Sequence, residues 1–192
     1  FVEYFENIYI MMNKPQGYIS STYDVDPTVV DILDDFYKTL DLSIAGRLDK
    51  DTRGLLILST DGNFIHKITS PNSNIEKTYE VETRDLIDES LVEEFLQGVY
   101  IAEDDYQARP AKLKIIDDKK AIVKVTEGKF HLVKRLFSNL GNEVVELKRI
   151  AIGELRLDPF LNEGDYRELN EKELALFTNW LNEGKEVICI KI

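Results

Sequence analysis

The sequence has little cysteine and no long apolar run, and each absence excludes certain classes of protein. Cys189 is the one cysteine among 192 residues, so no disulfide can form within the chain and no zinc-ligand spacing exists. No apolar stretch approaches the length of a membrane span, and the N-terminus lacks the order of basic, apolar and small residues that marks a signal peptide. We therefore expect a soluble, cytoplasmic protein without membrane association.

Linkers, internal repeats and low-complexity segments are also absent. Apolar residues make up 43% of the chain, which is enough for one good core or two small adjoining ones. Strand-like runs, several hairpins and scattered helical patterns do not alternate strictly along the sequence. This arrangement predicts an α+β fold with a mixed, largely antiparallel sheet and peripheral helices.

The chain is also short of positive charge, because its net charge is −12 at pH 7. A chain of this charge repels RNA as a whole, since affinity for phosphates comes mainly from Lys and Arg. The basic residues are clustered, however, and a basic cleft in an acidic body remains compatible with the sequence. The clusters are Arg47, Lys50 and Arg53; Lys129, Lys134 and Arg135; and Lys148 with Arg149.

The most informative stretch is Gly46 to Gly62, which reads GRLDKDTRGLLILSTDG. Its apolar run from Leu55 to Leu58 is bounded by turn signals, a pattern that predicts a short buried strand. Asp49 would then lie in the loop that leads into a rigid element, where a carboxylate can do chemistry.

Three other readings of Asp49 compete with a catalytic role. A calcium loop of the EF-hand type fails, because Arg53 and Thr60 stand where that loop needs an oxygen ligand and a bidentate glutamate. A solvated charged turn is the ordinary meaning of an Asp-Lys-Asp run. A glycosidase-like pair of Asp49 and Asp51 depends on a carboxylate separation that spacing alone leaves open.

Several motifs in one order resemble the ribosomal-RNA pseudouridine synthases of the RsuA type. GRLDKDTRGLLILSTDG resembles the motif around the catalytic aspartate of that family. The other matching segments are MNKPQGYISST at Met12 to Thr22, DPTV at Asp26 to Val29, ITSP at Ile68 to Pro71, EKTYEV at Glu76 to Val81 and EGKFHLVKRLFSNLGNEVVELKR at Glu127 to Arg149. The resemblance covers nearly the whole chain.

The resemblance implies an isomerase that detaches a uracil from its ribose, rotates it and rejoins it through carbon, without cofactor or metal. Asp49 would act on the ribose, either by attacking the anomeric carbon or by removing the neighbouring proton to give a glycal. Tyr79 would pack on the base, where it could also serve in proton transfer, and Lys134 would keep Asp49 ionised. Arg47 would position the flipped-out nucleotide.

The same resemblance gives further substrate-binding candidates, which are Arg53, Lys129, His131 and Arg135. Leu132 stands where the family pattern has a glutamine after the residue matched by His131. The expected fold is the pseudouridine synthase fold, with residues 1–192 forming two adjoining subdomains around a central catalytic cleft. Proteins of this type begin with a small RNA-binding S4 domain, which we expect to be absent from this chain.

We therefore predict a monomeric pseudouridine synthase that acts on small-subunit (16S) ribosomal RNA, within an assembly intermediate of the small subunit. The alternatives are an enzyme of the same family acting on large-subunit (23S) ribosomal RNA, and a catalytically silent RNA-binding module. A calcium-binding or hydrolytic protein built on Asp49, Asp51 and Asp61 is a further alternative, which requires a metal ion.

Hydrophobic periodicity predicts the remaining elements. A strand at Ile8 to Met12 is followed by a loop from Asn13 to Gly17. Asp26 is expected to cap a helix that turns Val29, Val30, Leu33 and Phe36 inward. The strand at Glu76 to Arg84 places Tyr79 on the side of the core or cleft. Three further helices are predicted at Asn63–Ile68, at Asp88–Gln97 with Leu91, Val92, Phe95 and Leu96 inward, and at Phe130–Leu140, which Gly141 ends. A last helix is predicted to be capped by Asn170, with Leu174, Phe177 and Leu181 inward. The other predicted strands are Val99–Ala102, Ala111–Ile116, Ala121–Thr126, Val144–Leu147, Leu155–Leu157 and Val187–Ile190.

Overall fold

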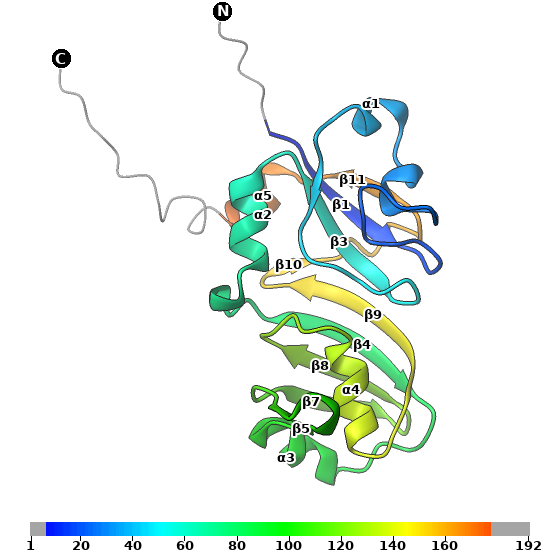
Figure 1. Cartoon of the computed structure of the whole chain (residues 1–192), viewed down its shortest axis with the longest axis vertical. Coiled ribbons are helices and arrows are strands. Elements are labelled where there is room, and N and C mark those ends of the chain that lie inside the picture. Colours follow the sequence, from blue (N-terminus) through cyan, green and yellow to red (C-terminus); the bar gives the residue numbers. More distant parts are fainter. Residues whose placement is uncertain (1–6, 178–192) are drawn as a thin grey trace, which may run out of the picture.

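The computed structural model describes residues 7–177, and one twisted sheet runs through this whole part of the chain (Figure 1). The sheet has nine strands, of which seven follow the order β11-β1-β3-β9-β4-β8-β7; β10 pairs with β9, and β2 with β3. Only the β3–β9 pair is parallel among the named strands of the described residues. The predicted α+β fold with a largely antiparallel sheet is confirmed.

The strands are short except in the middle of the sheet. Their bounds are β1 Tyr9–Lys14, β2 Ser43–Ile44, β3 Arg53–Ser59, β4 Lys77–Thr83, β5 Tyr100–Ile101, β6 Tyr106–Gln107, β7 Lys112–Asp117, β8 Lys120–Val125, β9 Val144–Ile152, β10 Leu155–Arg156 and β11 Tyr166–Glu168. The helices are α1 Asp35–Lys38, α2 Gly62–Thr69, α3 Ser90–Gln97, α4 Leu132–Asn139 and α5 Glu171–Ala175, and single 3-10 turns occupy Val29–Ile32, Pro71–Ser73 and Ala102–Asp104.

Strand β3 is buried on both faces, which explains why its sequence is a continuous apolar run rather than an alternating one. Leu55 and Ile57 pack into one apolar cluster with residues of α2, whereas Leu56 and Leu58 pack into a second cluster on the other face. All four side chains are fully buried. The loop before β3, which carries Asp49, is therefore attached to a strand that is buried along nearly its whole length.

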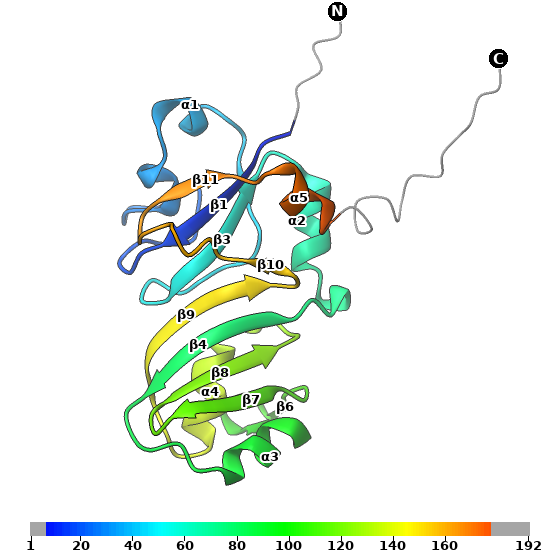
Figure 2. The same ribbon diagram turned by 180° about the vertical axis from the view of Figure 1, so that it is seen from behind.

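A third apolar cluster lies in the half of the sheet formed by β4, β7, β8 and the start of β9. Helices α3 and α4 supply part of it, including Phe95 and Phe137, whose ring centroids lie 5.1 Å apart. In Figure 2 the strands β9, β4 and β8 lie in front of α4, so this helix covers one face of that half. Helix α4 thereby comes to lie beside the loop that carries Asp49.

Some predicted elements differ from the observed ones. The helix expected after Asp26 is wrong: Thr28 caps a single 3-10 turn, the backbone is extended at Leu33, and the separate helix α1 leaves Phe36 exposed. The hydrogen bond from the Thr28 amide to the Asp31 carboxylate, 2.7 Å long, closes this short turn. Leu96 is also exposed rather than inward.

Other differences concern the ends of elements. Strand β1 continues through Asn13 and Lys14 instead of ending at Met12, because these residues pair with the start of β3. Helix α4 begins at Leu132, so Phe130 lies outside it, and the strand predicted at Val99 turns into the 3-10 turn at Ala102. The cap of α5 is confirmed, with Asn170 and Glu173 in a reciprocal capping box. Cys189, Leu181 and the predicted strand Val187–Ile190 lie outside the described residues.

Candidate active site

The loop that carries Asp49 lies where β3 and β9 meet. Gly54 pairs with Arg149 at the parallel crossing of the two strands. Its φ is +107°, and a Cβ atom at this position would lie 2.2 Å from the carbonyl oxygen of Arg149. Only glycine permits both this backbone conformation and this close approach. Gly54 therefore allows β9 to lie directly beside the start of β3.

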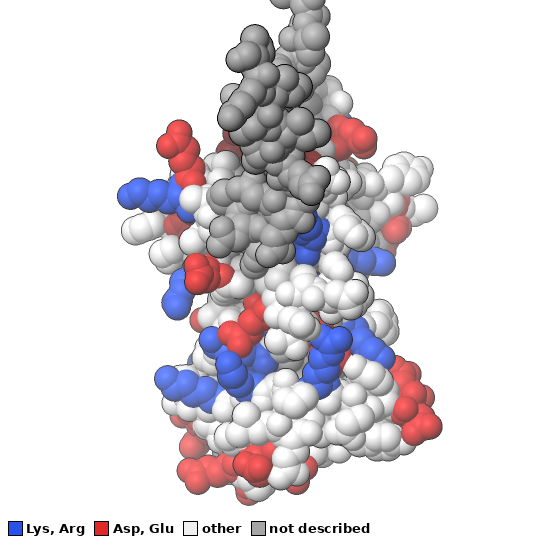
Figure 3. All heavy atoms as spheres, turned by 90° about the vertical axis from the view of Figure 1, so that its left-hand side faces the viewer, with Lys and Arg blue, Asp and Glu red and all other residues white. Residues whose placement is uncertain are grey.

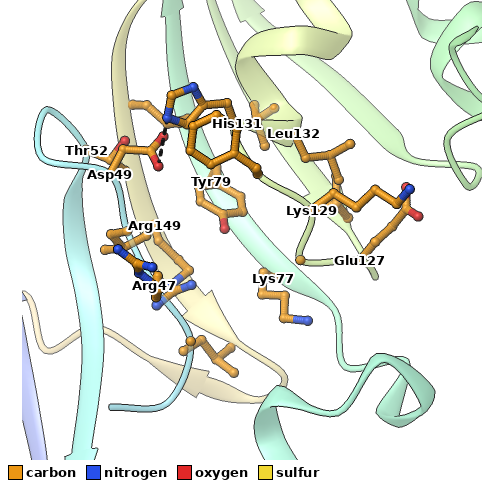
Figure 4. Close-up of a pocket in the computed structure, with 18 of the residues that line it drawn as sticks. Arg47, Asp49, Thr52, Lys77, Tyr79, Glu127, Lys129, His131, Leu132 and Arg149 are labelled. Atoms are coloured by element: carbon orange, nitrogen blue, oxygen red, sulfur yellow. Dashed lines mark ion pairs between the residues drawn. The ribbon is translucent and has the colours of Figure 1, made fainter. Parts of the chain in front are cut away.

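Two nitrogen groups at the start of α4 contact the Asp49 carboxylate. Nε2 of His131 lies 3.2 Å from Oδ1, and Nζ of Lys134 lies 3.3 Å from Oδ2. The Asp49 side chain is 26% exposed, so it reaches solvent at one side while its partners hold the other. Figure 4 shows the imidazole of His131 directed at the carboxylate. The structure thus brings together the predicted residues Asp49, His131 and Lys134.

Lys134 is shared between two carboxylates. Its Nζ lies 2.6 Å from Oδ1 of Asp51. Burial raises the pKa of Asp51, but the hydrogen bond and the charge of Lys134 outweigh that effect, so the pKa of Asp51 is lowered. The Asp51 side chain is 70% exposed and is absent from the cleft described next. Asp49 is therefore the carboxylate of this pair that faces the cleft.

A cleft of about 740 Å³ opens beside Asp49, a volume within the range of small-molecule sites. Its lining combines apolar side chains, including Leu132 and Ile152, with polar groups from distant parts of the chain. The predicted site residues among the lining are Arg47, Asp49, Tyr79, Lys129 and His131.

Tyr79 reaches the cleft from β4, as the two-residue period of that strand predicts (Figure 4). Within the described residues, its hydroxyl has no hydrogen-bond partner, which leaves the group available to a ligand. Leu132, at the position of the family's glutamine, is 5% exposed and belongs to the apolar cluster under α4. This side chain shapes the cleft by packing and supplies no polar group.

Arg53 and Arg135, two predicted substrate-binding residues, do not line this cleft. The guanidinium of Arg53 is paired with Glu146 at 2.8 Å and with Glu163 at 2.7 Å. Arg135 is paired with Asp104 at 2.7 Å. Their carboxylate partners come from distant segments of the chain, and a role of these two residues in substrate binding stays a prediction.

Lys14 is a site residue that sequence reasoning missed. It is fully buried, and its ammonium donates to the main-chain carbonyls of Asp49, Thr52 and Pro15 at 3.0, 2.8 and 3.1 Å. Burial lowers the pKa of Lys14 to about 8, while the nearby carboxylates of Asp51 and Asp49 oppose that shift. The Asn-Lys-Pro segment resembles an exposed loop in sequence, and no local signal reveals a buried cation that fixes the Asp49 loop.

Arg149 is a second residue that the sequence showed only as part of a basic cluster. Its side chain is 3% exposed and lines the cleft near Arg47 (Figure 4). Nε donates to the carbonyl oxygen of Leu55 at 2.9 Å, whereas the buried Nη2 has no hydrogen-bond partner among the described residues. A buried guanidinium with an unused donor is costly unless a ligand accepts from it.

The metal-dependent alternative finds no support in the residues that the structure describes. No group of three His, Cys, Asp or Glu side chains there is placed to hold a metal ion. Asp61 caps α2 and accepts a hydrogen bond of 2.7 Å from Tyr9, at the end of β3 opposite to Asp49. The three aspartates of that alternative therefore do not converge.

Comparisons with known proteins identify the family of the chain. The family model described as RNA pseudouridylate synthase matches residues 8–147. The chain is 44% identical over 168 residues to the ribosomal small subunit pseudouridine synthase A of Escherichia coli, covering 87% of this chain and 72% of that protein. It is also 46% identical over 180 residues to an uncharacterized RNA pseudouridine synthase, YtzG, of Bacillus subtilis, covering 91% and 75% respectively.

A crystal structure of a pseudouridylate synthase superposes with a TM-score of 0.85 at 42% identity, covering 88% of this chain and 73% of that one. The chain belongs to the RNA pseudouridylate synthase family. It is an isomerase that converts uridine to pseudouridine in RNA.

Proposed function

We propose that this chain isomerises a specific uridine of small-subunit ribosomal RNA, with Asp49 as its catalytic carboxylate. The observation that carries the proposal is the position of Asp49, which lies at the wall of the cleft and is held by His131 and Lys134 at 3.2 and 3.3 Å. The target follows from relatives named ribosomal small subunit pseudouridine synthase A that are 42–44% identical to this chain.

The reaction breaks the bond between C1′ of the ribose and N1 of uracil and forms a bond from C1′ to C5. C5 loses its proton and N1 gains one, so the product has the same composition as the uridine. We assign to Asp49 either attack on C1′ or removal of the proton on C2′, which would give a glycal. Lys134 and His131 keep the carboxylate oriented, and the ammonium of Lys134 counterbalances its charge. Both routes require the target nucleotide to leave its stack and enter the cleft.

The remaining cleft residues are assigned to substrate binding. Tyr79 packs on the uracil, and its free hydroxyl is placed to take part in proton transfer. Arg47 and the unused Nη2 of Arg149 donate to acceptor groups of the nucleotide. Lys129 contributes positive charge at the opposite wall, where its ammonium lies 3.1 Å from the ring centroid of Tyr106.

The charge distribution is compatible with RNA despite the net charge of −12. In Figure 3, Lys and Arg side chains gather across the lower middle of the face, while Asp and Glu side chains stand at its lower edges. Acidic edges repel RNA that is misplaced, and a basic centre attracts phosphates to the cleft. We place the protein on RNA as a monomer, within an assembly intermediate of the small subunit.

Helices able to cross a membrane are not found among the described residues. We place the reaction in the cytoplasm because its proposed substrate is ribosomal RNA. The chain spans about three quarters of the length of the relatives that it matches. We propose that it corresponds to their catalytic domain.

The direct test is incubation of the purified chain with small-subunit ribosomal RNA, both free and in precursor particles, followed by chemical mapping of pseudouridine. The proposal predicts one new pseudouridine at a single position of this RNA. Large-subunit ribosomal RNA is treated in parallel. Modification of that RNA alone would contradict the target, and modification of neither would contradict turnover by this chain.

A further inference from the structure

Phe130 is an exposed aromatic side chain at the lip of the cleft. It lines the cleft and is 72% exposed. Phe130 is exposed because it precedes α4, which begins at Leu132. His131, with φ of 49°, turns the chain so that Leu132 and Val133 enter the core, and Phe130 is left on the outer side of this turn. The apolar ring therefore remains in solvent beside the reactive carboxylate.

One face of this ring is already occupied. The Phe130 and His131 rings are stacked, with centroids 3.6 Å apart and planes inclined by 20°. His131 in turn lies 3.2 Å from the Asp49 carboxylate, which fixes the imidazole. The ring of Phe130 is thus oriented from behind by a group anchored in the site, while its other surface faces solvent.

A fixed aromatic ring with one open face suits a flat ligand with a π surface. Proteins that bind unpaired RNA use such rings as platforms on which bases stack. A base drawn into the cleft leaves its neighbour without its stacking partner, and that neighbour remains at the cleft mouth. Lys129, the preceding residue, also lines the cleft, where its ammonium lies over the ring of Tyr106.

We propose that the open face of Phe130 stacks on a nucleobase adjacent to the target uridine, so that the Phe130–His131 pair forms a second base-binding subsite next to the reactive one. This inference rests on the proposed function, because it takes unpaired RNA as the ligand. It assigns to Phe130 the replacement of the stacking that the neighbouring base loses when the target uridine enters the cleft.

The first experiment measures the binding of oligouridylate and does not depend on turnover. Phe130→Trp introduces an indole at the platform, while Trp180 is the one tryptophan of the unaltered chain. Oligouridylate should quench the fluorescence of the variant well beyond that of the unaltered chain. An oligomer of equal length with abasic ribose should not do so. Equal quenching by both oligomers would overturn the proposal, because phosphate contact alone would explain it.

The second experiment compares affinities for oligouridylate at one salt concentration. Stacking of a base on an aromatic ring predicts a loss of about tenfold or more for Phe130→Ala. Phe130→Tyr should retain the affinity, and Phe130→Leu should not, because leucine is apolar but has no π face. The matched control is Phe160→Ala, since Phe160 is 89% exposed and does not line the cleft.

Two results would overturn the proposal here. One is a Phe130→Leu variant that binds as well as the unaltered chain, which would reduce Phe130 to a support for His131. The other is a loss in Phe130→Ala no larger than that in Phe160→Ala. If the unaltered chain binds oligouridylate with these properties but modifies no ribosomal RNA, the platform stands and the proposed target fails, so the two failures are distinguishable.

Discussion

The ammonium of Lys134 lies 3.3 Å from Oδ2 of Asp49. The same ammonium lies 2.6 Å from Asp51, so one cation serves two carboxylates of different exposure. Asp49 is 26% exposed and Asp51 is 70% exposed, and solvent screens the interaction with Asp51 more strongly. Removal of this one charge should therefore affect both Asp49 and Asp51.

Lys134→Met should lower the single-turnover rate about tenfold or more at saturating RNA, because Asp49 loses the positive charge of its ammonium partner. It should also raise the pKa of Asp51, which Lys134 now holds below its ordinary value. Carboxyl carbon chemical shifts followed by NMR over pH measure the second effect. Arg135→Met is the matched control, since Arg135 lies on the same helix and pairs with Asp104. An Asp51 pKa that is unaltered in Lys134→Met would contradict this interpretation.

The sign of the related stability change follows from the lowered pKa of Asp51. A carboxyl group whose pKa falls on folding stabilises the protein at pH values above its pKa in the unfolded chain. This contribution is lost as the pH falls through its lower pKa in the folded chain. Lys134→Met should thus unfold at an acid midpoint slightly nearer neutrality. The difference should be small because Asp51 is largely exposed.

Lys14→Met should reduce the free energy of unfolding by about 1–3 kcal/mol near neutral pH, because the main-chain carbonyl groups of the Asp49 loop and of Pro15 lose their donor. The loop that carries Asp49 should also become mobile, with a lower rate at saturating RNA. Urea titration and single-turnover assays measure the two effects. Lys38→Met is the control, since Lys38 is exposed on α1. A variant with unaltered stability and rate would show that Lys14 does not fix the loop.

Lys14 also predicts a dependence of stability on pH. Its folded pKa of about 8 lies below the ordinary value of 10.5, so the unfolded chain binds more protons between these values. The contribution of this group to the free energy of unfolding therefore rises with pH from about 8 to 10.5, and is lost as the pH falls through 8. The difference in stability between the unaltered chain and Lys14→Met should grow across that window.

Gly54→Ala should destabilise the protein by about 3 kcal/mol or more, because a left-handed residue is strained and the new methyl group meets β9. Gly62→Ala is the matched control. A Cβ atom at Gly62 has no neighbour within 4 Å, and the position begins α2, so alanine should be neutral or slightly stabilising. Urea unfolding measures the free energy of unfolding of both variants. Equal stability of the two variants would contradict the close contact of β3 with β9.

Arg47→Ala should weaken RNA binding and reduce the slope of log affinity against log salt by about 0.7 for each lost phosphate contact. Arg53→Ala should leave both quantities nearly unaltered, because Arg53 is paired with Glu146 and Glu163 outside the cleft. Fluorescence anisotropy at several salt concentrations makes the comparison. A larger loss in Arg53→Ala would restore Arg53 to the RNA-binding surface.

Local patterns in the sequence predicted much of the fold. The apolar run at Leu55 to Leu58 marked a buried strand, and the two-residue period of β4 placed Tyr79 on the correct side. These predictions succeeded because burial on a strand depends on a short repeat. The helix predicted after Asp26 failed because the Thr28 to Asp31 contact favours a single turn over a continuous helix.

The rest of the site depends on contacts between distant segments. The partners of Arg53 come from β9 and the loop before β11, and the partner of Arg135 comes from the 3-10 turn at Ala102. Lys14 is buried because its strand pairs with β3, and Arg149 is buried because β9 lies against Gly54. A charged residue gives no local signal of burial, since burial depends on what the fold brings around it.

The central claim is that Asp49 performs the reaction, and Asp49→Asn tests it most directly. The purified variant and the matched control Asp51→Asn are compared with the unaltered chain for RNA affinity and for single-turnover pseudouridine formation. Asp49→Asn should bind RNA as the unaltered chain does and form product at less than about one hundredth of its rate, whereas Asp51→Asn should stay active. Product formation by Asp49→Asn near the unaltered rate would contradict the account.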